Sequence, residues 1–201
     1  MSLAKVTEDK ERESGAGFDG TWVAHPDLVP VARKPFDAVL GDRPNQLDRS
    51  REDVSVSAGD LLDFRVPGAD VTEEGLHNDV AVGLRYLQAW LTGNGAAGIF
   101  NLMEDVATAE IARSQVWQWI HRGRFTEGAV RGVMKEEVDR IREEGGGDRR
   151  LDEAEALFSE VALQNAPGSG GVPRNARGSG GVPRSDDFVE FLTVPAYEVL
   201  E

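Results

Sequence analysis

The sequence contains no cysteine and only three histidines among its 201 residues. The missing thiol excludes disulfides, thiolate catalysis and cysteine-ligated zinc. His25, His77 and His121 do not pair at a spacing typical of metal ligands. No apolar run approaches the roughly 18 residues that a membrane-spanning helix needs, and the first residues lack the shape of a signal peptide. These absences predict a soluble, cytoplasmic protein.

Basic residues are scarce: 22 Lys and Arg stand against 36 Asp and Glu, which gives a net charge of -14. Nucleic acids and anionic membranes attract concentrated positive charge, so neither is expected as a partner. The acidity is most simply a solubilising surface. The length allows one domain, or one and a half, with a sizeable core.

The sequence of the first third of the chain predicts little regular secondary structure. Residues 3–14 favour a helix, and Thr21–Val23 favour a short strand that ends at Pro26, followed by a helical turn at 27–32. A single strand has no partner, so we expect the chain to be a piece of something larger. Residues 33–71 are expected to form a connector, because 33–52 are polar and punctuated by Pro and Gly, and 53–66 alternate as one or two short strands.

The rest of the chain predicts a compact bundle of five helices joined by short loops. Apolar residues recur at intervals of three to four, and Gly93, Gly123 and the glycines from 145 end successive segments. The expected helices lie at 72–92, 96–103, 106–120, 126–144 and 150–165.

Residues 166–185 contain the heptapeptide Gly-Ser-Gly-Gly-Val-Pro-Arg twice. A flexible insertion of low complexity is the expected interpretation. A phosphate-binding loop is disfavoured, because no Lys-Ser/Thr follows the glycines and no strand precedes them. The terminal residues 186–200 are apolar enough to dock on the bundle through Phe188, Phe191 and Leu192.

Two adjacent acids, Glu104 and Asp105, interrupt an apolar segment just before the Trp-rich helix 106–120. Asp is a favoured helix N-cap, and Asp105 is placed to accept an N–H from Ala107 or Thr108. A carboxylate against apolar surface is also suited to act as a general base. The two roles are compatible, because a capping carboxylate is held in a fixed orientation. Glu104 is expected to point into solvent or toward an Arg.

Several long segments, taken in order, resemble A-type malate synthases. The segment Gly-Phe-Asp-Gly-Thr-Trp-Val-Ala-His-Pro at 17–26 resembles the last strand of that family's barrel, and Asn-Leu-Met-Glu-Asp at 101–105 resembles its catalytic-base segment. Residues 76–95, 115–121 and 187–197 continue the resemblance. It covers most of the chain except the connector and the Gly-rich repeat.

The resemblance implies an enzyme that condenses acetyl-CoA with glyoxylate and water to give malate and CoA, with Mg²⁺, in the glyoxylate bypass beside the tricarboxylic acid cycle. It also implies a (β/α)₈ TIM barrel followed by a helical plug domain. We therefore expect a mainly α chain: residues 1–32 as the end of the barrel with a short β element, 33–71 as a connector, and 72–201 as the plug. The Mg²⁺ ligands and the active-site Arg are expected in barrel segments that this chain lacks.

The resemblance assigns three site residues. Asp105 is the general base, Met103 lines the channel of the pantetheine arm, and Pro26 borders the CoA adenine. The alternatives are an N-cap for Asp105, core packing for Met103 and a turn residue that ends a strand for Pro26. His25 is expected to be structural, Trp117 to pack in the core, and Trp119 to contact the barrel.

Alone, this chain is expected to be inactive. A different hypothesis is a non-catalytic helical module that binds a protein partner, and the barrel-facing apolar surface would favour self-association. A third is a relative of acyl-thioester lyases, which are not expected to carry the Asn-Leu-Met-Glu-Asp segment.

Overall fold

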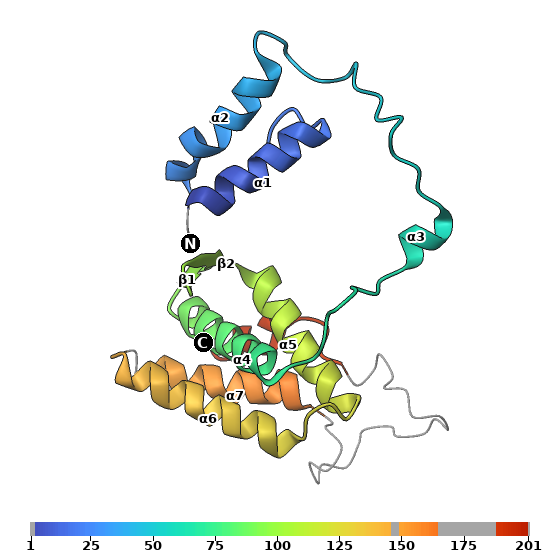
Figure 1. The fold of residues 1–201 in the computed structure, drawn as a ribbon. Coiled ribbons are helices and arrows are strands. Elements are labelled where there is room, and N and C mark those ends of the chain that lie inside the picture. Colours follow the sequence, from blue (N-terminus) through green and yellow to red (C-terminus); the bar gives the residue numbers. More distant parts are fainter. Residues whose placement is uncertain (1–2, 146–148, 165–187, 201) are drawn as a thin grey trace. The chain divides into compact units, whose positions relative to one another are not determined.

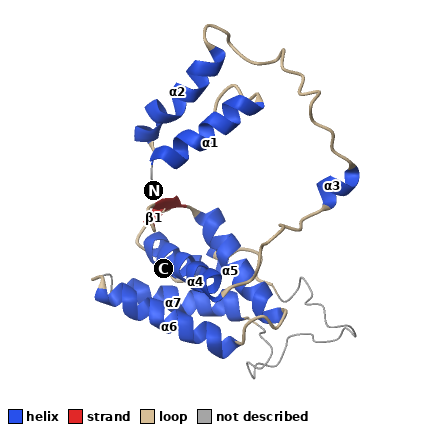
Figure 2. Ribbon diagram, in the orientation of Figure 1, coloured by secondary structure: helices blue, strands red, loops and turns tan. Residues whose placement is uncertain are grey.

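The computed structural model describes residues 3–145, 149–164 and 188–200. Its chain forms two compact units, Met1–Ala69 and Asp70–Glu201. Helices dominate both units, which confirms the mainly α class (Figure 2). Among the described residues, no helix is both long enough and apolar enough to cross a membrane. The expected insertion at 166–185 lies outside the described residues.

The N-terminal unit is built on two helices that lie side by side, α1 (Leu3–Ala16) and α2 (Val29–Leu40) (Figure 1). A 3-10 turn, Pro26–Leu28, precedes α2, and a five-residue helix, α3 (Ala58–Leu62), follows it. The helix predicted at 3–14 is confirmed. The helical turn predicted at 27–32 is longer than expected, since α2 extends well into the predicted connector.

The strands expected in this unit are wrong. Residues 21–23 have no regular secondary structure, and 53–66 contain only α3 within irregular chain. A strand leaves its N–H and C=O groups unpaired unless a neighbour accepts them, and no second strand is present in the described part of this unit. At 57–60 the local sequence favours a helix instead, because Ser57 and Asp60 form a reciprocal capping box.

Polar contacts hold the chain after α2 against α1. The side chain of Gln46 is buried, and its Nε2 donates to the carbonyl oxygens of Ser14 at 3.0 Å and Phe18 at 2.8 Å. The Nη1 of Arg51 donates to the carbonyl oxygen of Ala16 at 2.7 Å. These donors satisfy carbonyls at and just after the C-terminal end of α1, where intrahelical partners run out.

The C-terminal unit contains four long helices, α4 (Glu73–Leu91), α5 (Val106–His121), α6 (Glu127–Glu143) and α7 (Arg149–Leu163). It also has the antiparallel strands β1 (Ala97–Ile99) and β2 (Leu102–Glu104) and a short helix, α8 (Thr193–Tyr197). Side-chain caps start α4 and α6, where Thr72 accepts from Gly75 N–H and Thr126 from Ala129 N–H.

The five-helix bundle is wrong in one member, because residues 96–103 form a hairpin rather than a helix. Ala97 and Ile99 are buried while Gly98 between them is exposed, which is the alternation of a strand. Gly95 and Gly98 also weaken a helix at this point. The other four predicted helices are confirmed.

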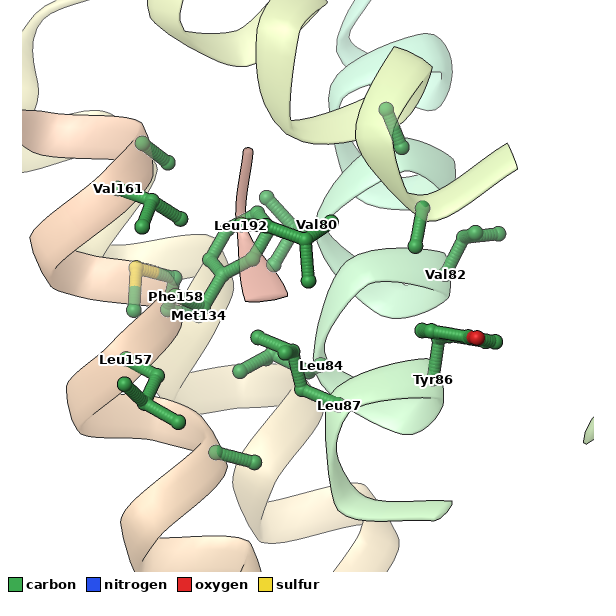
Figure 3. Packing of buried hydrophobic residues seen from close by; sticks show 14 of the residues in the cluster. Val80, Val82, Leu84, Tyr86, Leu87, Met134, Leu157, Phe158, Val161 and Leu192 are labelled. Carbon is green, nitrogen blue, oxygen red and sulfur yellow. The ribbon is translucent and has the colours of Figure 1, made fainter. Parts of the chain in front are cut away.

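The core of the C-terminal unit surrounds α4, which packs against α5, α6 and α7. Val80, Leu84 and Leu87 lie on the side of α4 that faces Phe158 of α7 (Figure 3). Gly83 makes this approach possible, since a Cβ built there would lie 2.1 Å from Cε2 of the Phe158 ring.

The C-terminal residues dock on this core, as predicted, although not through every residue expected. Leu192 is 1% exposed and Phe188 packs edge-to-face on Trp117, with ring centroids 5.0 Å apart. Phe191 is 53% exposed and supplies little of the contact, which corrects the prediction. Ala196 of α8 is fully buried and supplies a further apolar contact.

Candidate functional site: a capped carboxylate beside a hairpin

A two-residue turn joins the strands of the hairpin. Ile99 pairs with Leu102, so Phe100 and Asn101 form the turn, and both have positive φ angles, 49° and 62°. This is the backbone of a type I′ turn, whose twist matches that of two paired strands. Asn tolerates this conformation well, whereas Phe adopts it at a cost. The hairpin thus directs the chain from β2 straight into α5.

Asp105 lies between β2 and α5 and caps the helix. Its Oδ1 accepts the N–H of Ala107 at 2.9 Å and the N–H of Thr108 at 3.3 Å. The predicted cap and both predicted donors are therefore present. The helix N-terminus also favours the negative charge of this group. Among the described residues, none donates to Oδ2 or forms an ion pair with the carboxylate, and Asp105 is exposed.

The surface around Asp105 is apolar. Four side chains on the hairpin and the first turn of α5 are exposed: Phe100 at 51%, Leu102 at 42%, Met103 at 44% and Val106 at 43%. We call these four residues the hairpin surface. Glu104 departs from its prediction, because it is buried at the end of β2 instead of pointing into solvent, and among the described residues no Arg forms an ion pair with it. Asp105 is therefore the exposed acid of the pair.

Two polar side chains of α4 support the hairpin. Tyr86 is 1% exposed, and its hydroxyl donates to the carbonyl oxygen of Gly95 at 3.1 Å. Burial raises the pKa of Tyr86, and the negative charge of Asp105 raises it further. Arg85 donates to Glu137 at 2.6 Å and to Glu144 at 2.7 Å, while its guanidinium lies 5.6 Å from the centroid of the Phe100 ring.

The other predicted site residues lie at the surface. Met103 is exposed on β2, opposite Gly98, so it is not a core residue. Pro26 is exposed in the N-terminal unit as the first residue of the 3-10 turn. His25 caps that turn through Nδ1, which accepts the N–H of Asp27 at 3.2 Å, as expected of a structural histidine. Pro26 belongs to the N-terminal unit and Met103 to the C-terminal unit.

Sequence reasoning missed a buried ion pair on α5. Arg113 is fully buried, and its Nε donates to Oε1 of Glu110 at 2.6 Å. The signal was present, since the two opposite charges are three residues apart on a helix and Arg113 follows the buried Ala109 and Ala112. The prediction for Trp117 is wrong, because Trp117 is half-buried outside the hydrophobic core and stacks on His121 with centroids 3.9 Å apart. Trp119 packs against the core beside Phe125, and its contact with a barrel stays a prediction.

An exposed carboxylate that caps a helix is common in proteins and does not by itself define a function. Comparison with known proteins identifies the enzyme family. Residues 1–64 match the family domain described as "Malate synthase, TIM barrel domain", and residues 70–167 match "Malate synthase, C-terminal". The chain belongs to the malate synthase family.

Individual relatives agree with this assignment. The chain is 48% identical to a malate synthase of Streptomyces clavuligerus over 99% of its own length and 35% of the relative's. It is 36% identical to malate synthase A of Escherichia coli strain K12, over 98% of this chain and 35% of that protein. A glyoxysomal malate synthase of Zea mays is 43% identical over 79% of this chain and 31% of the relative. The chain spans about a third of the length of these curated relatives.

Proposed function

We propose that this chain supplies the general base, Asp105, of a malate synthase that condenses acetyl-CoA with glyoxylate and water to give malate and CoA. The observation that carries the proposal is the exposed carboxylate of Asp105, held by Ala107 and Thr108 in a chain of this family. In the glyoxylate bypass this reaction consumes acetyl-CoA beside the tricarboxylic acid cycle. The expected compartment is the cytoplasm.

The geometry of Asp105 suits removal of a proton from the acetyl methyl group. Two backbone N–H groups fix Oδ1, which leaves Oδ2 to take the proton from the methyl carbon. The resulting enolate carbon forms a bond to the aldehyde carbon of glyoxylate, and the aldehyde oxygen becomes an alkoxide that takes the proton back from Asp105 as the malate hydroxyl. Water then cleaves the thioester: its oxygen bonds to the acyl carbon, the C–S bond breaks, and CoA leaves as the protonated thiol. Apolar surroundings strengthen the interactions of the base with its substrate.

The described residues do not fit a magnesium site. No group of three or more His, Asp or Glu side chains among them lies close enough to hold a metal ion. We therefore assign to this chain no ligand of the Mg²⁺ that the family resemblance implies, and no step of the reaction is routed through it.

Met103 and Pro26 are proposed to contact CoA. Met103 presents a flexible, apolar side chain on the hairpin surface two residues before the base, which suits contact with the pantetheine arm. Pro26 presents an exposed ring on a rigid 3-10 turn, which suits packing against the adenine base. Both contacts are proposals that a structure with bound CoA would test.

Asp105→Asn in a full-length malate synthase that contains this segment tests the proposal. Asn caps a helix about as well as Asp, so the melting temperature should not change. The amide cannot accept the proton, and kcat should fall by a factor on the order of 10² to 10⁴. Thr126→Ala is the matched control, because it removes the cap of α6, costs about 1 kcal/mol of stability and should leave kcat intact. Wild-type kcat in Asp105→Asn would remove the assignment.

The alternative, a non-catalytic interaction module, is favoured by the exposed hairpin surface. Both hypotheses predict self-association of the isolated chain, and they differ in the assembled enzyme. The isolated chain should form no malate, because one base alone does not assemble a catalytic site. Turnover by the isolated chain would contradict the account, and a full-length protein without malate synthase activity would favour the module.

A further inference from the structure

The Glu110–Arg113 pair of α5 holds a segment from the far end of the sequence. We call residues 188–200 the C-terminal strap. Nη2 of Arg113 donates to the carbonyl oxygens of Val189 at 2.5 Å and Glu190 at 3.2 Å. Oε2 of Glu110 accepts the N–H of Leu192 at 2.9 Å. One ion pair therefore satisfies three backbone groups of the strap.

The contact is desolvated as well as polar. Arg113 is fully buried, and its guanidinium lies 4.0 Å from the centroid of the Phe188 ring. A buried charge is tolerated only when it is paired and hydrogen-bonded. Replacing such a pair by apolar residues is often neutral or stabilising, so its presence is weak support for a role in stability. The specific gain is geometric, since Nη2 of Arg113 and Oε2 of Glu110 together fix where the strap crosses α5.

The other end of the strap reaches α4. The ring of Tyr197 meets the ring of Trp90 edge-to-face, with centroids 5.1 Å apart and an interplanar angle of 86°. Trp90 is in the last turn of α4, whereas Glu110 is in the second turn of α5. The strap thus joins the end of α4 to the start of α5. These are the two helix ends between which the chain forms the hairpin and Asp105.

We propose that Glu110 and Arg113 are positioning residues, which set the start of α5 through the strap and so aim the Asp105 carboxylate at the acetyl methyl group. This inference rests on the proposed function of Asp105. A base acts only within hydrogen-bond reach of its proton, and a displacement of about 1 Å can reduce the rate on the order of 10²-fold. Fixing α5 one turn beyond Asp105 restricts such a displacement.

Full-length enzyme carrying Glu110→Gln, Arg113→Lys or both tests the inference. Each single variant should lower kcat roughly 10- to 100-fold, with the KM values for acetyl-CoA and glyoxylate changed less than about threefold. The double variant should lose no more than the worse single one, because the two side chains act as a unit. The matched control is Glu127→Gln with Arg131→Lys, which alters an ion pair within α6 and should leave kcat unchanged.

Tyr197→Ala tests the same strap if the variants of buried residues fail to fold. Tyr197 is 62% exposed, so its truncation should leave the protein folded. It should lower kcat in the same direction, by about 3- to 10-fold, with the melting temperature recorded for every variant. Wild-type kcat in folded variants, or a rise in KM alone, would overturn the inference.

Asp105→Asn is assayed in parallel: if it is inactive while the strap variants are fully active, only the positioning role fails. If Asp105→Asn is active, the proposed function itself fails.

Discussion

Different interactions stabilise each of the two units of this chain. The hydrophobic core of the C-terminal unit extends from Leu76 to Ala196. In the described part of the N-terminal unit only Ala32, Pro35 and Phe36 are buried apolar residues, and hydrogen bonds from Gln46 and Arg51 supply much of the order. Its later residues even expose large apolar side chains, among them Val54, Val56, Leu61, Leu62, Phe64 and Val66. One unit is organised by its own core, whereas the other presents surface of the kind that interfaces bury.

The largest effect is expected in the core of the C-terminal unit. Gly83→Ala places a methyl group 2.1 Å from Cε2 of the Phe158 ring, which is fully buried and must shift to accept it. The variant should lose about 3 kcal/mol in the free energy of unfolding, measured with urea. Gly132→Ala is the matched control on α6, where nothing lies within 4 Å of the added Cβ. That variant should gain up to about 1 kcal/mol. Equal effects would show that the α4–α7 packing is looser than described.

A second test uses pH. Asp79 on α4 is 9% exposed, and burial raises its pKa to about 6, against the opposing effect of its hydrogen bond with Asn78. Between pH 4 and 6 the folded state therefore holds a proton that the unfolded state has released, so this group destabilises the fold as pH rises. The full shift corresponds to roughly 3 kcal/mol at neutral pH, of which we expect about 2 after local relaxation.

Asp79→Asn should remove this dependence. Its free energy of unfolding, relative to the unmodified chain, should rise by about 2 kcal/mol between pH 4 and pH 7. Urea unfolding at both pH values measures the change. Taking the difference between the two proteins cancels the opposite contribution of acids such as the half-exposed Asp139, whose pKa is lowered mainly by the hydrogen bond from Lys135. A difference that does not change with pH would contradict the raised pKa of a buried Asp79 carboxylate.

The smallest effect is expected in the N-terminal unit. Gln46→Ala removes the hydrogen bonds to Ser14 and Phe18, and each is worth about 1 kcal/mol net. Amide exchange in residues 3–28 should become about 5- to 30-fold faster, while exchange in α4 and α5 stays the same. The exposed Gln118→Ala is the control, with no change expected in either unit. Faster exchange throughout the chain would show that the two units unfold together.

Local signals in the sequence located most of the helices and the cap at Asp105. The spacing of apolar residues predicted α4 to α7. Gly93, Gly123 and Gly145 were predicted to end helices, and each has a positive φ angle just after a helix end. The capping donors of Asp105 were also predictable, because a cap depends on the next three residues alone. The position of Asp105 is thus observed, while its role as a base is still a proposal.

Features that depend on distant residues were not predictable. The strand expected at 21–23 needed a partner that the described part of the unit does not contain. The hairpin at 97–104 depends on burial against α4 and on an unusual backbone conformation at Phe100. The contacts of Glu110 and Arg113 with the strap join residues 76 to 82 positions apart, which no local pattern reveals.

The most direct test of the central claim is the distance from Oδ2 of Asp105 to the acetyl methyl carbon, measured in a structure of the full-length enzyme with acetyl-CoA bound. The account predicts roughly 3 to 3.5 Å, with Oδ1 still accepting the N–H groups of Ala107 and Thr108. A carboxylate that faces away from the methyl group, beyond the reach of one bridging water, would contradict it.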